Sequence, residues 1–289
     1  MMETVYPDLK KHVDESGDAL GALVVPAVVV QQIEADGADL LLIVLSEREG
    51  THGRVSTYAV GTWKVKEVRA HSTRLAADIL SGDRPGLVHC FRYGNILYDP
   101  DKRIHHICSS LEEFPHELRS KKSCIEFSRL LKNTLETKAY LNKGYLLDAY
   151  VTIQNGLQHW GRLAVIDAGQ YPHIRLWNQV KPLSPGIYKL YQELVHGNDS
   201  LEQRMELVLL AVEYSILSNL THYCAYILEL MAAKPGMWSV EELSRQLALE
   251  QMELDLTLLL EELVKRSVLE EVLLQGDNKG QPRYRIQLP

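Results

Sequence analysis

Ala38-Asp39-Leu40-Leu41-Leu42-Ile43-Val44-Leu45 is the stretch from which the fold of this chain can be inferred. One carboxylate is followed by an uninterrupted run of large aliphatic residues, and the turn signal Asp36-Gly37 precedes it. An apolar run of this length, bounded by a turn, indicates a strand buried in a sheet rather than a helix. Asp39, at the start of this strand, has two interpretations: a turn residue, or the first ligand of a metal site.

The composition limits the class of protein. The chain has 289 residues, of which 46% are hydrophobic and 24% charged, as is ordinary for a globular protein of two or three domains. Its formal net charge of -7 argues against a protein that mainly coats nucleic acid. No apolar stretch reaches the roughly 18 residues of a membrane span, and the N-terminus lacks the pattern of a signal peptide. The scattered cysteines favour free thiols, so we expect a cytoplasmic protein without a membrane partner.

Residues 1–115 alternate between strand and helix signals. Short β-rich or apolar runs predict strands at residues 20–25, 27–30, 39–45, 55–60, 63–68 and 96–98. Residues 49–53 are typical of a hairpin loop. Helices are expected from Ser72, closed by Gly82, and from Pro85, closed by Gly94. A mixed sheet covered by helices, of the α/β or α+β class, is the simplest architecture for this pattern.

The rest of the chain has two further patterns. Apolar residues recur every three or four positions from Leu146 to Ala164, and Ser200 with Gln203 forms a capping box, as expected for a helical bundle at residues 116–220. Residues 221–289 predict three helices and a hairpin around a polar turn at residues 275–280, which is the pattern of a winged helix-turn-helix. We therefore expect three domains: 1–115, 116–220 and 221–289.

Five stretches of the chain carry a resemblance to known protein sequences: Leu20-Gly21-Ala22-Leu23, Asp39-Leu40-Leu41-Leu42, residues 94–99, residues 144–150 and residues 162–167. Together they resemble the nucleotidyltransferase superfamily, and more closely a nucleotidyltransferase-like family of Gram-positive, Bacillus-type bacteria. The resemblance covers nearly the whole chain. It implies a nucleotidyltransferase domain, a helical substrate-binding domain and a C-terminal helix-turn-helix domain.

The resemblance also implies a site for nucleotide phosphates and divalent ions. Nucleotidyl transfer uses two Mg²⁺ ions held by carboxylates on one face of a sheet, and backbone amides at a small-residue turn approach the phosphates. Asp39 and Glu67 are the expected catalytic metal ligands, and Gly21 and Ala22 are expected near the phosphates of ATP or another nucleotide. Leu41 stands where the second acidic residue of the superfamily signature belongs, so we expect a degenerate metal site.

Simpler interpretations of the same residues stay open. Asp39 fits a turn residue after Asp36-Gly37, and Glu67 fits a solvated position on a strand. Lys121 and Lys122 lie on a basic helix that follows the first domain. They fit either a phosphate-binding site or a solvated helical face.

The charges of the winged helix favour a protein partner over DNA. The presumed recognition helix carries Glu253, Asp255, Glu261 and Glu262, which would repel phosphates at its leading end. The wing offers the cations Lys279, Arg283 and Arg285. We expect this domain to contact a protein or a second copy of the chain, and DNA binding is disfavoured.

The sequence thus predicts a nucleotidyltransferase-like pseudoenzyme that binds a nucleotide or another phosphorylated small molecule between its first two domains. One alternative is an active, Mg²⁺-dependent nucleotidyltransferase that modifies a small molecule or a protein. Another is a regulatory adaptor that acts through the winged helix on a protein or, less favoured, on DNA.

Overall fold

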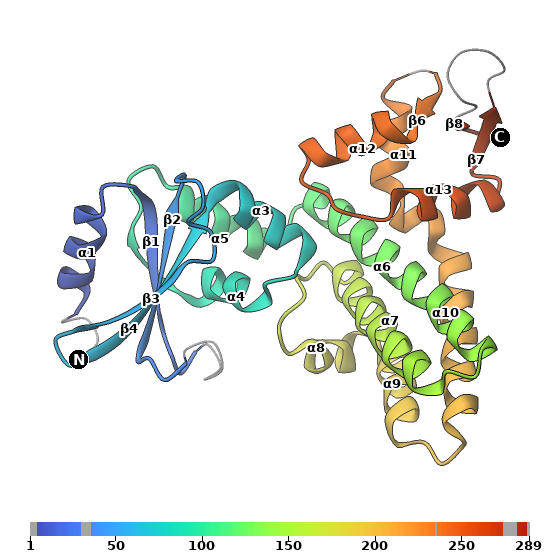
Figure 1. Ribbon diagram of the computed structural model, residues 1–289, viewed down its shortest axis with the longest axis horizontal. Coiled ribbons are helices and arrows are strands. Elements are labelled where there is room, and N and C mark those ends of the chain that lie inside the picture. Colours follow the sequence, from blue (N-terminus) through green and yellow to red (C-terminus); the bar gives the residue numbers. More distant parts are fainter. Residues whose placement is uncertain (1–4, 30–35, 235, 274–281, 288–289) are drawn as a thin grey trace. The chain divides into compact units, whose positions relative to one another are not determined.

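The computed structural model describes residues 5–29, 36–234, 236–273 and 282–287, which form two compact units, Met1–Pro115 and His116–Pro289. The first unit is a five-stranded sheet with helices on both faces (Figure 1). Its elements are α1 (Tyr6–Glu15), β1 (Ala19–Pro26), β2 (Leu40–Ser46), β3 (Val55–Val60), β4 (Trp63–His71), α3 (Ser72–Ser81), α4 (Pro85–Tyr93), β5 (Asn95–Tyr98) and α5 (Arg103–Glu113).

The strands lie in the order β3-β4-β2-β1-β5, and β2 pairs with β4 in parallel while the other neighbours are antiparallel. The predicted α/β class and the central strand after Asp39 are therefore confirmed. Two local predictions are wrong. The loop at residues 49–53 does not close a hairpin, because β4 lies between β2 and β3. Residues 27–29 form a turn rather than a strand, and Val30 lies outside the described residues.

The central strand β2 is buried on both faces, which explains its nearly continuous aliphatic sequence. Leu40, Leu42 and Val44 pack on the face covered by α1, together with Leu9 and Val13 of that helix. The alternate residues lie on the opposite face, where α3, α4 and α5 pack, as Figure 1 shows. Side chains at even positions of β2 therefore point to α1, and those at odd positions point away from it.

The second unit contains the helical bundle and the winged helix (Figure 1). Gly144, in a left-handed conformation, separates the long helices. Ser200 forms the capping box expected from the sequence, and Ser239 forms a second one. The predicted boundary at residue 220 falls inside a helix that continues to Tyr223. The elements are α6 (His116–Asn142), α7 (Leu146–Asp167), α8 (Leu176–Leu183), α9 (Pro185–His196), α10 (Leu201–Tyr223), α11 (Ala225–Ala232), β6 (Trp238–Ser239), α12 (Val240–Leu249), α13 (Leu256–Lys265), β7 (Leu269–Leu273) and β8 (Pro282–Ile286).

No helix within the described ranges is both long enough and apolar enough to cross a bilayer.

Candidate functional site

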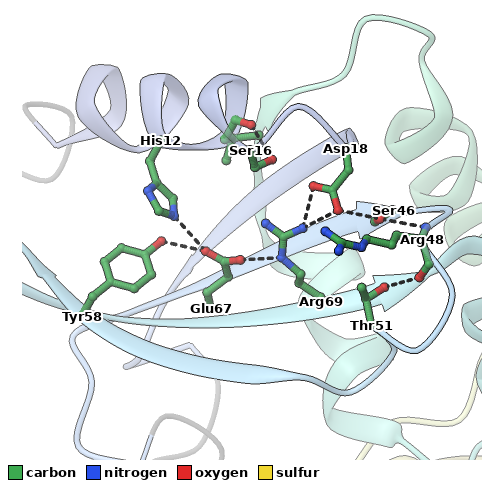
Figure 2. A network of polar contacts seen from close by, with 10 residues as sticks. His12, Ser16, Asp18, Ser46, Arg48, Thr51, Tyr58, Glu67 and Arg69 are labelled. Atoms are coloured by element: carbon green, nitrogen blue, oxygen red, sulfur yellow. Dashed lines mark hydrogen bonds and ion pairs between the residues drawn. The ribbon is translucent and has the colours of Figure 1, made fainter.

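A network of polar side chains lies between α1 and the strands β3 and β4 (Figure 2). Its centre is Glu67, which is only 4% exposed although it is ionisable. One carboxylate oxygen of Glu67 accepts hydrogen bonds from the hydroxyl of Tyr58 at 2.9 Å and from Nε2 of His12 at 3.1 Å. The other accepts one from Nε of Arg69 at 2.9 Å. A buried carboxylate with three partners is a fixed part of the wall, not a solvated surface group.

Arg69 joins this carboxylate to a second one. Its terminal nitrogen donates to both carboxylate oxygens of Asp18, at 2.7 and 2.9 Å. Burial alone would lower the pKa of Arg69, but the hydrogen bonds to Asp18 and Glu67 raise it above its ordinary value. Burial opposes ionisation of Asp18 as well, yet the hydrogen bond and charge of Arg69 lower the pKa of that carboxyl group. Burial and the Glu67 charge raise the pKa of Tyr58, so its hydroxyl stays a hydrogen-bond donor.

A turn after β2 brings a further cation to this network. Ser46 donates to Asp18 at 3.4 Å and accepts from the backbone N–H of Arg48 at 3.0 Å. The Thr51 hydroxyl donates to the carbonyl of Arg48 at 2.6 Å, and Gly50 permits the left-handed backbone that the turn requires. These contacts fix the backbone that carries Arg48 beside the network.

The network forms the floor of a pocket of about 350 Å³. Arg48 and Arg54 also line it, and their guanidinium groups make no hydrogen bond or ion pair with any other described residue. The charged lining is thus three guanidinium groups against two carboxylates, a balance of one positive charge. The complete lining is His12, Ser16, Asp18, Arg48, Thr51, Arg54, Ser56, Tyr58, Glu67 and Arg69.

The structure does not bring Asp39 and Glu67 together, so the predicted metal site on this pair is wrong. Asp39 precedes β2, and its carboxylate accepts a hydrogen bond from the backbone N–H of Lys64 at 2.8 Å. Glu67 is paired with Leu42, three positions further along, which is roughly 10 Å away at about 3.3 Å per residue. Because side chains alternate along a strand, positions three residues apart also point to opposite faces of the sheet, so Asp39 and Glu67 lie on different faces.

The residues therefore do not fit a two-ion Mg²⁺ site of the expected kind. The Glu67 carboxylate is bonded to Arg69, and a fixed cation at that distance opposes a second cation. The Asp39 carboxylate accepts a backbone hydrogen bond from Lys64 of β4, 25 residues along the chain, so it links two strands. Within the described ranges, no three His, Cys, Asp or Glu side chains cluster as metal ligands.

The predicted phosphate contact at Gly21 and Ala22 is also wrong. Both residues lie inside β1 and are buried, so their amides form no exposed turn. Gly21 is small for a packing reason: a Cβ at this position would lie 2.5 Å from Cγ1 of Ile104 on α5. The glycine permits α5 to approach the sheet closely.

Lys121 and Lys122, the other predicted phosphate ligands, are held in ion pairs inside the second unit. Nζ of Lys121 lies 2.5 Å from Glu117 and 2.6 Å from Glu250. Lys122 is 1% exposed, and its Nζ lies 3.7 Å from the buried carboxylate of Glu126. These lysines stabilise the packing of α6, and neither presents an open charge to a ligand.

The winged helix is packed against the bundle. Leu259, Leu260 and Leu263 of α13, the presumed recognition helix, are fully buried. The backbone N–H of Asp255 donates to the hydroxyl of Ser128 on α6 at 3.1 Å, and the two helices pack on each other. The cations of the wing are paired at Arg283 with Glu242 and at Arg285 with Glu270, while Lys279 and the turn at residues 275–280 lie outside the described residues.

The sequence alone does not reveal most of the polar pocket. It predicts a role for Glu67, but as a metal ligand, and it predicts none for Arg69. The available signal was the alternation of Val65, Glu67 and Arg69, which puts two opposite charges on the same face of a strand as a core valine. His12 carries no local signal of this kind, because its partner lies 55 residues away in the chain.

Comparison with known proteins gives consistent results along the whole chain. Residues 2–119 match the family described as Nucleotidyltransferase-like, residues 120–219 the YgxA-like substrate binding domain, and residues 225–285 a Helix-turn-helix domain. The uncharacterized protein YgxA of Bacillus subtilis (strain 168) is 32% identical over 206 residues, 71% of this chain and 69% of YgxA. The crystal structure of a nucleotidyltransferase-like protein from Exiguobacterium sibiricum superposes with a TM-score of 0.85, covering 100% of both chains at 22% identity.

Proposed function

Because the chain belongs to the family of nucleotidyltransferase-like proteins that includes YgxA, we propose that it binds a nucleotide or another phosphate-bearing ligand in the polar pocket on the α1 face of the sheet. One observation carries the proposal. Arg48 and Arg54 reach a pocket of about 350 Å³, and no carboxylate in the described part of the chain is bonded to either of them. Guanidinium groups bind phosphate oxygens through paired, charge-assisted hydrogen bonds, and a pocket of this volume lies in the range of small-molecule sites.

The fixed network beneath these arginines supports the same proposal. Arg69 is paired with both Asp18 and Glu67, a set that carries one net negative charge, so Arg69 forms part of a rigid floor rather than a ligand contact. The extra positive charge of the pocket therefore resides on Arg48 and Arg54, at its exposed rim. A ligand with two or more phosphate charges would be held there without prior displacement of a protein carboxylate.

We derive no nucleotidyl transfer step. The carboxylate pair that would hold the metal ions lies on two faces of the sheet, and Leu41 replaces the other expected ligand. Asp18 and Glu67 are committed to Arg69. The proposed activity is ligand binding by a nucleotidyltransferase fold, in which guanidinium groups replace the metal ions as the phosphate contacts.

Calorimetric titration with ATP, in the presence and absence of Mg²⁺, tests this proposal. We expect binding without Mg²⁺, and a loss of at least about tenfold in affinity in the double variant R48A/R54A, since a hydrogen bond to a charged group contributes about 1.5–3 kcal/mol. Arg245→Ala, at an exposed arginine of α12, is the matched control and is expected to bind like the parent chain.

Two results would contradict the proposal. Equal affinity in the parent chain and in R48A/R54A would remove the arginines from the site. Binding that requires Mg²⁺ and is lost in Asp39→Ala would restore the metal-dependent transferase as the better explanation. Titration with inorganic phosphate alone shows whether the phosphate group is sufficient for recognition.

A second candidate function, as an adaptor, concerns the winged helix. Its recognition helix is packed on α6, and the residues that remain exposed at and beside this helix include Glu253 and Glu261. Acidic groups repel a phosphate backbone, so a protein partner with basic side chains fits this surface better than DNA. A shift assay with duplex DNA at low salt, where electrostatic attraction is strongest, is expected to show no complex.

A further inference from the structure

A second pocket, of about 330 Å³, lies on the opposite face of the sheet, near the start of α4. Its walls are mainly aliphatic: Leu41 and Ile43 from β2, Val55 from β3, Val68 from β4 and Leu87 from α4. The pairings place these strand residues together, since Ile43 is opposite Val68 and Val68 is opposite Val55. The pocket is thus built by the sheet itself.

This pocket stays open because β3 is an edge strand and α4 lies over β1. Val55 is consequently 51% exposed, although the aliphatic side chains of Leu41, Ile43, Val68 and Leu87 in the same pocket are buried or half-buried. An exposed valine beside buried aliphatic side chains gives the pocket an apolar mouth as well as an apolar floor. Such a surface is stabilised by an apolar ligand group that excludes water from it.

Position 41 is where the second acidic residue of the nucleotidyltransferase signature belongs, and it shares its face of β2 with position 39. In this chain the face that would hold metal ions and a triphosphate carries Leu41, Ile43 and Val68 instead. A hydrated Mg²⁺ ion finds no oxygen ligand among these side chains. Leu41, in place of the expected carboxylate, therefore contributes to the wall of a small apolar pocket.

One side of this pocket carries charged groups. Arg84 and Lys66 line it together with Asp83, and Lys66 also lies 4.0 Å from Asp36, so Arg84 is the cation that an anionic ligand would contact. The guanidinium of Arg84 lies over Gly53: a Cβ at that glycine would be 2.7 Å from one terminal nitrogen of Arg84. Arg84 is exposed, and its guanidinium makes no hydrogen bond or ion pair of 4 Å or less with the rest of the described chain.

We propose that this second pocket binds a small aliphatic carboxylate, such as a medium-chain fatty acid, with its chain against Leu41, Ile43 and Val55 and its carboxylate at Arg84. The described lining contains no aromatic side chain, so a flexible aliphatic chain fits it better than a stacked ring. The guanidinium of Arg84 selects an anion over a neutral chain of the same length. The site is separate from the polar pocket, because the two pockets share no residue and open on opposite faces of the sheet.

Calorimetric titrations with octanoate and with 1-octanol test the proposal in the full chain. Val55→Trp fills the mouth of the pocket and is expected to weaken binding of both compounds about tenfold or more. Ala59→Trp is the matched control, because Ala59 is exposed on the same face of the same strand but does not line the pocket. It is expected to bind both compounds like the parent chain.

Arg84→Ala separates the charge from the apolar contact. We expect octanoate to bind at least about fivefold more weakly in this variant, and octanol to bind unchanged, since only the carboxylate uses the guanidinium. The variant R48A/R54A is expected to bind octanoate like the parent chain. The proposed octanoate site and the proposed phosphate site can therefore be confirmed or rejected independently. The proposal is overturned if the parent chain does not bind octanoate, if Val55→Trp binds it like the parent, or if Arg84→Ala weakens both compounds equally.

Discussion

Replacing Glu67 with Gln asks whether this buried carboxylate supports the polar pocket or contacts the ligand. In the parent chain Glu67 accepts hydrogen bonds from Tyr58, His12 and Arg69, and the amide of Gln has one oxygen and no charge. Loss of one partner from a fully buried ion pair costs about 3–5 kcal/mol. Arg69 keeps both bonds to Asp18 and is partly solvated, so we expect the lower result of about 2–3 kcal/mol.

Urea denaturation at neutral pH measures this loss in the free energy of unfolding. Glu49→Gln, at an exposed glutamate of the turn after β2, is the control and is expected to change stability by less than about 0.5 kcal/mol. The affinity for ATP is expected to change by less than about threefold, because neither Arg48 nor Arg54 is bonded to Glu67. An E67Q variant as stable as the parent chain would contradict a supporting role of Glu67, and a folded E67Q variant that no longer binds ATP would place Glu67 in contact with the ligand.

Three further predictions concern other parts of the chain. Burial alone would raise the pKa of Glu126, but its hydrogen bond from His159 and the nearby cations lower it from 4.5 to about 2. A lowered pKa in the folded state stabilises the fold above pH 4.5, and this stabilisation is lost as the pH falls towards 2. Between pH 6 and 2 the free energy of unfolding of the parent chain, measured by urea titration, should therefore fall by about 3 kcal/mol more than that of E126Q. Equal losses of stability in the two chains would contradict this prediction. Gly21→Ala forces a Cβ against Ile104 and should cost about 1–3 kcal/mol, visible as a lower melting temperature, and an unchanged melting temperature would show that α5 yields freely. Asp39→Ala should lower the free energy of unfolding by about 1 kcal/mol, because one hydrogen bond is lost, and should change the ATP affinity measured by calorimetry by less than about twofold. Loss of ATP binding in this variant would show that the Asp39 carboxylate belongs to the binding site.

The positions of strands and helices could be predicted because their signals are local. The aliphatic run after Asp39, the start of a helix at Pro85 and its end before Gly94 all follow from neighbouring residues. Strand pairing is not local. The loop at residues 49–53 has the composition of a hairpin loop, yet β2 does not pair with β3. Instead β3 and β4 form a hairpin with each other, and β4 pairs with β2.

The candidate site was harder to predict for the same reason. The contact between His12 and Glu67 spans 55 residues, and that between Asp18 and Arg69 spans 51. Each of these residues, seen alone, fits a solvated surface, and only tertiary packing buries the network. Lys122 shows the converse case: a lysine in a basic helix suggests an open charge, but the fold buries it beside Glu126.

The pairing register explains why the fold is retained while the expected metal site is not formed. Leu42 is opposite Glu67, and both point to the face covered by α1, whereas position 39 belongs to the other face. To bring Glu67 to that face, β4 would have to slip by one residue, which would also turn Val65 out of the core beneath α1. A slip of this kind removes a fully buried valine from its packing, so the register is fixed by the core. In this chain the carboxylate is therefore held on the face of α1, where it pairs with Arg69 and where Arg48 and Arg54 line the same pocket. For this reason we expect phosphate recognition by arginine, rather than metal-ion chemistry, on that face.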